Sequence, residues 1–266
     1  MPKKWSKREE QQQLNLLREL YIEKNLTIFQ VAKKLNIAYQ TVYDRLKRVG
    51  IKTIPYLKPN YTNKKILKCI PYSKELSEFI GIMCGDGHIS DEQVFVFLGN
   101  KSDDYGRYII DLFRKLFDND LKVVKRDKKY LILYLGFREL SRFLMDMGLV
   151  KNKVKEQVRV PKWILTDKDF MRAFIRGFFD TDGSIYKLRW GAQISFCNRS
   201  VQLLKDARKM LSLLGFHPSK ISVCHLYLTQ KSDLKRFLDE IGSNNTIKFN
   251  KLKNWVGTEV DKPGAL

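Results

Sequence analysis

The chain has 266 residues, of which 44% are hydrophobic, 12% aromatic and 30% charged, so a wholly disordered protein is excluded. No apolar run is long enough to cross a membrane, and the polar, lysine-rich start has no apolar signal segment. We therefore expect no membrane span and no secretion. Lys plus Arg number 50 against 29 acidic residues, a net charge of +21, which favours a nucleic acid as the partner over a membrane surface.

Cysteine usage points to a reducing compartment. Cys69, Cys84, Cys197 and Cys224 lie far apart in sequence, none belongs to a C-x-x-C pair, and the chain has only three histidines. This spacing does not predict a structural zinc site. Scattered cysteines are typical of intracellular proteins, in the cytoplasm, the nucleoid or an organelle matrix.

Residues 1–50 are expected to form a small all-α domain. Val31, Ala32 and Leu35 make one short apolar helix face, residues 36–38 make a turn, and Val42 and Leu46 begin the next face. Gly50 closes the second helix as a cap. The spacing is that of a helix-turn-helix and resembles the small DNA-binding modules of resolvases and bacterial regulators.

An ordinary helical hairpin is the alternative interpretation of this domain. If the module binds DNA, residues near the start of its second helix would contact bases. These candidates are Tyr39, Gln40, Thr41, Tyr43 and Arg45.

Residues 51–72 are rich in Lys, Tyr and Asn and contain Pro55, Pro59 and Pro71. The prolines forbid a continuous helix, so we expect an extended basic linker. Such a linker either lies along a DNA duplex or acts as a solvated tether.

An internal repeat begins at Ser73. Gly81, Asp86, Gly87 and Ile89 recur at an offset of 96 as Gly177, Asp182, Gly183 and Ile185. Further matched blocks follow in the same order: 100–102 with 198–200, 133–135 with 226–228, and 142–144 with 236–238. Gly148 also matches Gly242 at the offset of the last block. These five matches, with small offset changes between them, indicate two related halves with loop insertions.

Each half is expected to begin with a helix that ends at Asp-Gly. Strands are expected near 89, 94–98, 121–125 and 130–136 in the first half, and at 185–188, 193–197 and 221–228 in the second. Helices are expected at 105–117 and 138–145, and at 201–214 and 233–241. The predicted fold class is α+β, a pseudo-twofold pair of αββαββα halves with four-stranded sheets, at 73–160 and 161–252, before a flexible tail at 253–266.

The two Asp-Gly helices carry the chemistry. Gly81 and Gly85, like Gly177 and Thr181, are small residues four apart, a spacing that lets two helix backbones pack closely. If the helices are partners, Asp86 and Asp182 lie side by side and repel unless a cation sits between them. Oxygen ligands suit magnesium, and such a pair beside a basic surface indicates phosphodiester hydrolysis. The alternative is that each Asp-Gly is a turn and each glycine a helix cap.

The two nonapeptides, Phe79–Gly87 and Ile175–Gly183, resemble the two LAGLIDADG motifs of monomeric homing endonucleases. The resemblance covers residues 73–252. The second copy has both acidic residues, Asp180 and Asp182, whereas Cys84 replaces the earlier acid in the first copy.

This resemblance implies a monomer with an internal pseudo-dimer that cuts both strands of a long DNA site across the minor groove. It implies Mg²⁺ held by Asp86 and Asp182, water positioned by Asn100 and Asn198, and a lysine near each scissile phosphate. Lys248 fits that role in the second half and Lys153 in the first, where Lys151 and Lys155 are alternatives. The sheets would form a saddle in the major groove, with DNA contacts from Lys122, Arg126, Tyr186, Arg189 and Gln193.

Three functions stay open. The first is a site-specific DNA endonuclease with an added helix-turn-helix, of the kind that serves intron homing. The second is a DNA-binding regulator of the same fold without cleavage, which retention of both Asp86 and Asp182 disfavours. The third is a maturase that binds intron RNA, which the same fold supports.

Overall fold

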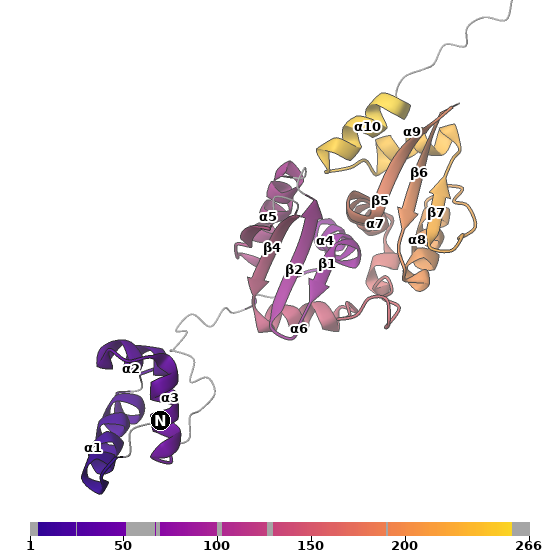
Figure 1. The fold of residues 1–266 in the computed structure, drawn as a ribbon. Helices are drawn as coiled ribbons and strands as arrows, with labels where there is room; N and C mark the ends of the chain where they lie inside the picture. Colours follow the sequence, from indigo (N-terminus) through magenta and orange to yellow (C-terminus); the bar gives the residue numbers. More distant parts are fainter. Residues whose placement is uncertain are drawn as a thin grey trace, which may run out of the picture. The chain divides into compact units, whose positions relative to one another are not determined.

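The computed structural model describes residues 5–24, 26–51, 67, 70–99, 103–126, 130–189 and 191–256. The chain forms two compact units, Met1–Lys64 and Lys65–Leu266 (Figure 1). Within the described residues, every helix is too short or too polar to span a bilayer.

The described residues of the first unit form three α-helices, α1 (Lys7–Leu17), α2 (Ile28–Leu35) and α3 (Tyr39–Arg48), with a π-helical segment at Arg18–Glu23. Thr27 caps α2 and forms a reciprocal capping box with Gln30. Asn36 adopts a left-handed φ of 52° and ends α2, so α3 begins three residues later. The predicted pair of helices joined by a short turn is therefore present.

A small core holds this unit together. Leu17, Val31, Val42 and Leu46 are fully buried. Gly50, at φ +71°, reverses the chain after α3, and the Ile51 N–H then donates to Leu46 O at 3.0 Å. Ile51 packs against the same core, one residue beyond the predicted boundary.

The first half of the second unit has seven elements. They are α4 (Lys74–Gly85), β1 (Gly87–Ile89), β2 (Gln93–Gly99), α5 (Asp103–Phe117), β3 (Lys122–Arg126), β4 (Tyr130–Gly136) and α6 (Arg138–Asp146). The strands form an antiparallel sheet in the order β1-β2-β4-β3. Most of the predicted linker lies outside the described residues, but Leu67 and Ile70 pack against the core of this unit, so its chain begins before Ser73.

The second half repeats this order with one strand fewer. It has a 3₁₀ helix (Lys162–Thr166), α7 (Lys168–Asp182), β5 (Gly183–Leu188), β6 (Gly191–Cys197), α8 (Val201–Leu213), β7 (His225–Leu228), α9 (Lys231–Glu240) and α10 (Thr246–Val256). The sheet order is β5-β6-β7, antiparallel throughout. The α+β fold predicted from the repeat is confirmed.

Two details of the prediction were wrong. The expected strand 221–228 is interrupted by a tight turn in which Ser222 and His225 exchange backbone hydrogen bonds of 2.9 and 2.8 Å, so only residues 225–228 form a strand and the second sheet has three strands. The expected tail at 253 is helical to Val256, because α10 continues and buries Leu252. Residues 257–266 lie outside the described chain.

The core explains the strand patterns. Inward residues of β2 and β4 alternate with exposed ones, so one face of each sheet packs on helices and the other is accessible. The buried residues of both halves form a single cluster around α4 and α7, which lie side by side where the halves meet (Figure 1).

Candidate active site

The two motif helices pack with their backbones in contact. A Cβ added to Gly81 would lie 2.3 Å from Phe174 O, and one added to Gly177 would lie 2.2 Å from Glu78 O. Both distances are far inside ordinary contact, so only glycine permits this separation. The small residues predicted at the helix interface are therefore where α4 and α7 touch.

This packing brings Asp86 and Asp182 to adjoining helix ends. Asp86 caps α4, and Asp182 is the last residue of α7. A Cβ on Gly85, the residue before Asp86, would lie 3.3 Å from Asp182 Cγ. Both residues are half-buried, so the two carboxyl groups lie at the adjoining helix ends and stay accessible.

The two carboxyl groups are electrostatically strained. Burial, and next the charge of Asp182, raise the pKa of Asp86 to about 6. Burial also raises the pKa of Asp182, against the opposing effects of a hydrogen bond from Asn198 and the charges of Lys153 and Lys248. A divalent cation between the carboxylates would offset both the desolvation and the repulsion, so these residues fit a hard, oxygen-binding metal ion.

A lysine closes the end of each motif helix. Lys248 Nζ donates to Phe179 O, Thr181 O and Gly183 O at 2.8, 3.0 and 2.6 Å. Lys153 Nζ donates to Met83 O at 3.4 Å and to Gly85 O, the repeat equivalents of the first two carbonyls. Phe179 O also accepts the N–H of Gly183, which caps α7. The last carbonyls of a helix are short of intrahelical donors, and a cation also suits the negative end of the helix dipole.

Burial shifts the pKa of both ammonium groups. It lowers the pKa of Lys248 to about 8 and lowers the pKa of Lys153, in each case against the attraction of the nearby acids. Of the three candidates in the first half, Lys153 alone reaches the helix end within the described residues. Lys151 pairs with Asp91, and Lys155 is exposed.

Asn198 lies beside one carboxylate. Its Nδ2 donates to Asp182 Oδ2 at 2.5 Å, and its Oδ1 accepts from Ser200 N at 2.7 Å. Asn100, its predicted partner in the first half, lies outside the described residues.

The strand register qualifies the equivalence of the two asparagines. Gly87 pairs with Val96 in the first sheet, and the equivalent Gly183 pairs with Phe196 in the second. Counting on from these pairs, the residue of the first half that is equivalent to Asn198 is Leu98, whose side chain is buried. Asn100 therefore comes two residues after the position that the register equates with Asn198, which the sequence alignment alone does not reveal.

The residues predicted to contact DNA from the sheets differ in their exposure. Lys122 pairs with Tyr134 on the accessible face of the first sheet, and Tyr186 pairs with Gln193 on that of the second. Lys122, Tyr186 and Arg189 are exposed and Gln193 is half-buried. Arg126 lies in β3, but its side chain is outside the described ones.

The predicted contacts of the first unit differ from expectation in one respect. Tyr39, Gln40 and Tyr43 are exposed, whereas Thr41 is half-buried. Arg45 was expected to point outward.

Instead, the Arg45 guanidinium donates to Gln13 Oε1 at 3.2 Å and lies 5.7 Å from the centroid of the Trp5 ring. The helix-turn-helix pattern extends only from 27 to 51, so it contained no signal that α1 would engage this side chain.

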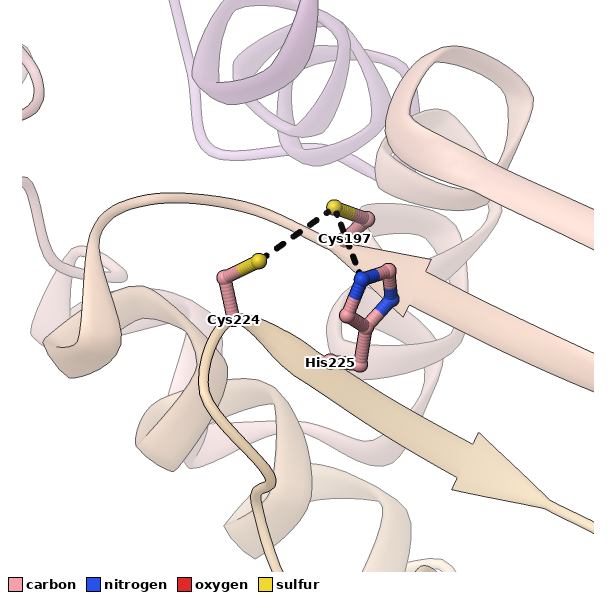
Figure 2. A group of neighbouring side chains, drawn as sticks. All are labelled: Cys197, Cys224 and His225. Carbon is pink, nitrogen blue, oxygen red and sulfur yellow. Dashed lines mark hydrogen bonds between the residues drawn. The ribbon is translucent and has the colours of Figure 1, made fainter.

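Two adjacent residues and a third that is distant in sequence lie together in the second half. Cys197 ends β6, Cys224 lies in the turn before β7, and His225 begins β7 (Figure 2). The sequence spacing predicts no zinc site here, yet the fold brings Cys197 and Cys224 together, because one ends β6 and the other lies in the turn before β7, and no spacing rule links these segments.

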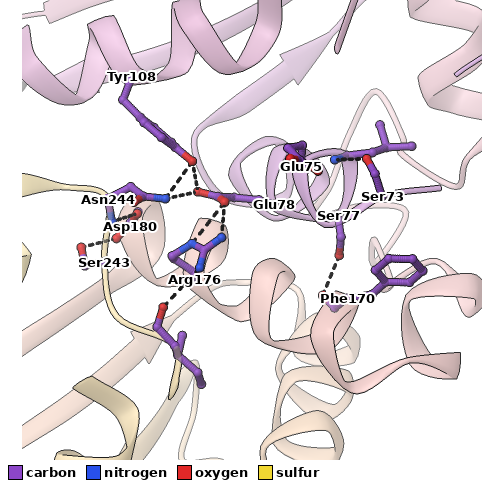
Figure 3. A network of polar contacts seen from close by, with 12 residues as sticks. Ser73, Glu75, Ser77, Glu78, Tyr108, Phe170, Arg176, Asp180, Ser243 and Asn244 are labelled. Carbon is purple, nitrogen blue, oxygen red and sulfur yellow. Dashed lines mark hydrogen bonds and ion pairs between the residues drawn. The ribbon is translucent and has the colours of Figure 1, made fainter. Parts of the chain in front are cut away.

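A buried polar network also escaped the sequence analysis (Figure 3). Glu78 accepts hydrogen bonds from Arg176 at 2.5 and 3.1 Å, from Tyr108 at 2.7 Å and from Asn244 at 2.6 Å. It joins α4, α5 and α7 to the loop before α10. In the sequence, this network is indicated only by Glu78, a charged residue within the apolar pattern of α4.

Asp180 anchors the same loop to α7. It accepts hydrogen bonds from Ser243 Oγ and, at 2.8 Å, from Asn244 N. Burial raises its pKa to about 7, against the hydrogen bond from Ser243. Cys84, its repeat equivalent, is buried, and burial raises the pKa of that thiol to about 12. The earlier motif position is thus structural in both halves.

Comparisons with known proteins agree with this fold. Residues 169–242 match the family described as a LAGLIDADG-like domain. The fold is similar to that of the homing endonuclease I-WcaI bound to its DNA recognition sequence, with a TM-score of 0.52 at 13% identity over 78% of this chain and 97% of that one. It is also similar to I-DmoI in complex with DNA and Ca, with a TM-score of 0.50 at 16% identity over 68% and 97%.

Two curated relatives match over most of this chain. One is the Replication factor C small subunit of Methanocaldococcus jannaschii, 30% identical over 200 residues, which are 71% of this chain and 10% of that protein. The other is the Replication factor C small subunit of Thermococcus kodakarensis, 24% identical over 199 residues, 70% of this chain and 22% of that protein. The chain therefore matches only a minor part of each relative.

Proposed function

We propose that the protein is a site-specific endodeoxyribonuclease that makes a double-strand break at a long DNA target by metal-dependent phosphodiester hydrolysis. The observation that carries this proposal is the pair of half-buried carboxylates, Asp86 and Asp182, at the adjoining ends of α4 and α7. Each half contributes one acid and one helix-capping lysine, so a single chain supplies two related sites, one for each strand.

Asp86 and Asp182 would hold Mg²⁺. When bound, the cation supplies an activated water and stabilises charge on the phosphate and the leaving oxygen. The chain's own contribution is to hold the two carboxylates close to one another, at a cost in burial that raises the pKa of both. With the pKa of Asp86 at about 6, most of this carboxyl is charged at pH 7 even before a cation binds.

The two lysines differ in what they can still bind. Lys248 donates its three N–H groups to three backbone carbonyls, so it acts as a positioning residue that adds positive charge. Lys153 donates to two carbonyls, which leaves one N–H without a partner among the described residues. We assign contact with a scissile phosphate to Lys153.

Asn198 is assigned the positioning of Asp182. One amide hydrogen holds a carboxylate oxygen at 2.5 Å, and the amide oxygen is fixed by Ser200 N. The second amide hydrogen is left to orient a water molecule next to the carboxylate. Asn100 would position water in the first half, although the strand register equates Leu98 and not Asn100 with Asn198.

DNA would lie along the accessible faces of the two sheets, with Lys122, Arg126, Tyr186, Arg189 and Gln193 as contacts. The net charge of +21 supports binding dominated by phosphates. The first unit would add recognition through Tyr39, Gln40, Thr41 and Tyr43. Arg45, held by Gln13, would support α3 rather than contact a base.

The test begins with selection, because the target sequence is unknown. Duplexes from a randomised DNA library are selected by binding to the full chain in Ca²⁺, and the bound pool is then transferred to Mg²⁺. The proposal predicts one cut in each strand at a fixed position in the selected sequences, and no cuts in EDTA. Bound duplexes that stay intact in Mg²⁺ and in Mn²⁺ would refute cleavage, and preferential selection of structured RNA would favour a maturase.

A further inference from the structure

The cluster of Cys197, Cys224 and His225 lies on the accessible face of the second sheet. The two Sγ atoms are 3.8 Å apart, and Cys197 Sγ is 3.7 Å from His225 Nε2. All three potential ligand atoms lie within 4.8 Å of one another. Figure 2 shows the three side chains directed toward a common point from β6, the turn and β7.

These separations match the edges of a tetrahedral zinc site. With Zn–S near 2.3 Å and Zn–N near 2.0–2.1 Å, tetrahedral angles place two sulfurs about 3.8 Å apart and a sulfur and a nitrogen about 3.6 Å apart. A disulfide requires a sulfur separation of about 2.05 Å. The separations in the cluster therefore fit an ion between the three side chains and do not fit a bond between the two sulfurs.

The backbone is strained where it delivers Cys224. The turn Ser222–His225 has Val223 at φ 54°, a left-handed conformation that a β-branched residue rarely adopts. Val223 is 87% exposed, so its side chain gains nothing from packing. The strain places Cys224 beside the cross-strand pair Cys197 and His225, which is a reason to look for a ligand there.

The repeat does not explain the cluster. The strand registers equate the pair Cys197–His225 with Phe97–Ile132 in the first sheet, where both residues are apolar. The ligands are thus a property of the second half alone, added to a shared framework.

We propose that Cys197, Cys224 and His225 bind a zinc ion through two thiolates and an imidazole nitrogen. Ser195 Oγ lies 3.5 Å from His225 Nδ1, where it can hold the ring in the tautomer that leaves Nε2 free for the metal. The Tyr227 ring stacks on the His225 ring, with the ring centroids 5.7 Å apart and an angle of 6° between the ring planes. The donor set is soft, so it selects zinc, whereas the carboxylates Asp86 and Asp182 select a hard cation.

The zinc ion would support the neighbouring carboxylate site. Asn198 follows Cys197 directly, and its backbone N–H donates to Cys224 O at 3.0 Å. An ion that joins the end of β6 to the turn therefore fixes the backbone from which Asn198 reaches Asp182. With three side-chain ligands among the described residues, the fourth coordination position is open to water or to a group of a bound partner.

The experiment uses the full chain, reduced and freed of metal, and titrates it with Zn²⁺ and, as a spectroscopic probe, with Co²⁺. We expect one tight ion per chain, with sulfur-to-cobalt charge-transfer bands and release of protons from the thiols. Cys197→Ser, Cys224→Ser and His225→Ala should each weaken Zn²⁺ binding by at least about 100-fold. Cys84→Ala, which removes a buried thiol elsewhere, is the matched control and should bind as the parent does.

The readout needs no DNA, so it is independent of the proposed nuclease activity. Circular dichroism of each variant distinguishes loss of ligand from loss of fold, and the cobalt spectrum of the unmodified chain stands without any variant. Absence of Zn²⁺ binding by the reduced chain would overturn the proposal. So would equal binding by all variants, or a Cys197–Cys224 disulfide that persists under mild reduction and excludes the ion.

Discussion

Replacing Gly177 by alanine tests the contact between the motif helices. The new methyl group would lie 2.2 Å from Glu78 O and 3.1 Å from Ile82 N. Both are backbone atoms of α4, so no side chain can rotate away. Ordinary contact begins near 3.4 Å, and the helices must therefore separate by about 1 Å in a core that is packed as densely as a crystal.

The expected loss of stability is about 2 kcal/mol. Overpacking a core costs about 1–3 kcal/mol, and the rigid backbone neighbours place Gly177→Ala at the upper end. Alanine is about 1 kcal/mol better than glycine within a helix, which offsets part of that cost. For a unit of the size of Lys65–Leu266, the melting temperature should fall by about 4–8 °C.

Two companion variants make the experiment specific. Gly99→Ala is the matched control, because a Cβ at that residue meets nothing within 4 Å, and its melting temperature should stay within about 1–2 °C of the parent. Gly81→Ala should destabilise like Gly177→Ala, since its Cβ would lie 2.3 Å from Phe174 O.

The double variant should lose less than the sum of the single losses, because one helix separation accommodates both methyl groups. A melting temperature of Gly177→Ala equal to that of the Gly99→Ala control would refute the backbone contact.

Three further predictions concern pH, salt and the first unit. Burial raises the pKa of Asp180 to about 7, so the folded state binds a proton more tightly than the unfolded state between about pH 4 and 7. The free energy of unfolding should therefore fall as pH rises through that window. Asp180→Asn, measured in EDTA, should flatten this dependence of the free energy of unfolding on pH. An unchanged dependence would contradict its attribution to Asp180. DNA affinity should fall about 10³–10⁵-fold between about 50 and 200 mM salt if about 6–10 phosphates are contacted; a flat dependence would contradict phosphate binding. Deleting residues 1–58 should shorten the DNase footprint on one side of the cut while cleavage at saturating protein stays at the same bonds, and an unchanged footprint would show that the first unit does not bind DNA.

The fold was predictable because local patterns and the repeat agree. Two Asp-Gly helices followed by alternating strands fixed the class, and small residues at Gly81 and Gly177 indicated the helix pair. The turn at Ser222–His225 was not predictable, because Val223 has no propensity for a left-handed conformation. The helical continuation to Val256 depends on burial of Leu252, a tertiary contact that a short segment does not reveal.

The part of the candidate site that lies in and next to the two Asp-Gly motifs was predictable from the sequence. Asp86, Asp182, Asn198 and Lys248 converge as expected, and Lys153 proves to be the lysine at the first helix end. The remainder depends on contacts between distant segments. Glu78 meets Asn244 across 166 residues, and neither residue stands out in its own sequence context.

The zinc ligands come from two strands and a strained turn. Their convergence follows from register, which the sequence of any single strand leaves open.

Cleavage by carboxylate variants tests the central claim most directly. The selected duplexes are incubated with the parent chain, with Asp86→Asn, with Asp182→Asn and with Asp104→Asn, an exposed carboxylate of α5 that serves as the control. Asn retains the shape of Asp but not the charge that a divalent cation requires. The account predicts that Asp86→Asn and Asp182→Asn bind the duplex in Ca²⁺ as the parent does. In Mg²⁺ both variants should cut it at least about 10³-fold more slowly, which is a loss of about 4 kcal/mol in transition-state stabilisation. Asp104→Asn should cut at the parental rate. Parental cleavage by either active-site variant would show that the paired carboxylates are not the site of the chemistry.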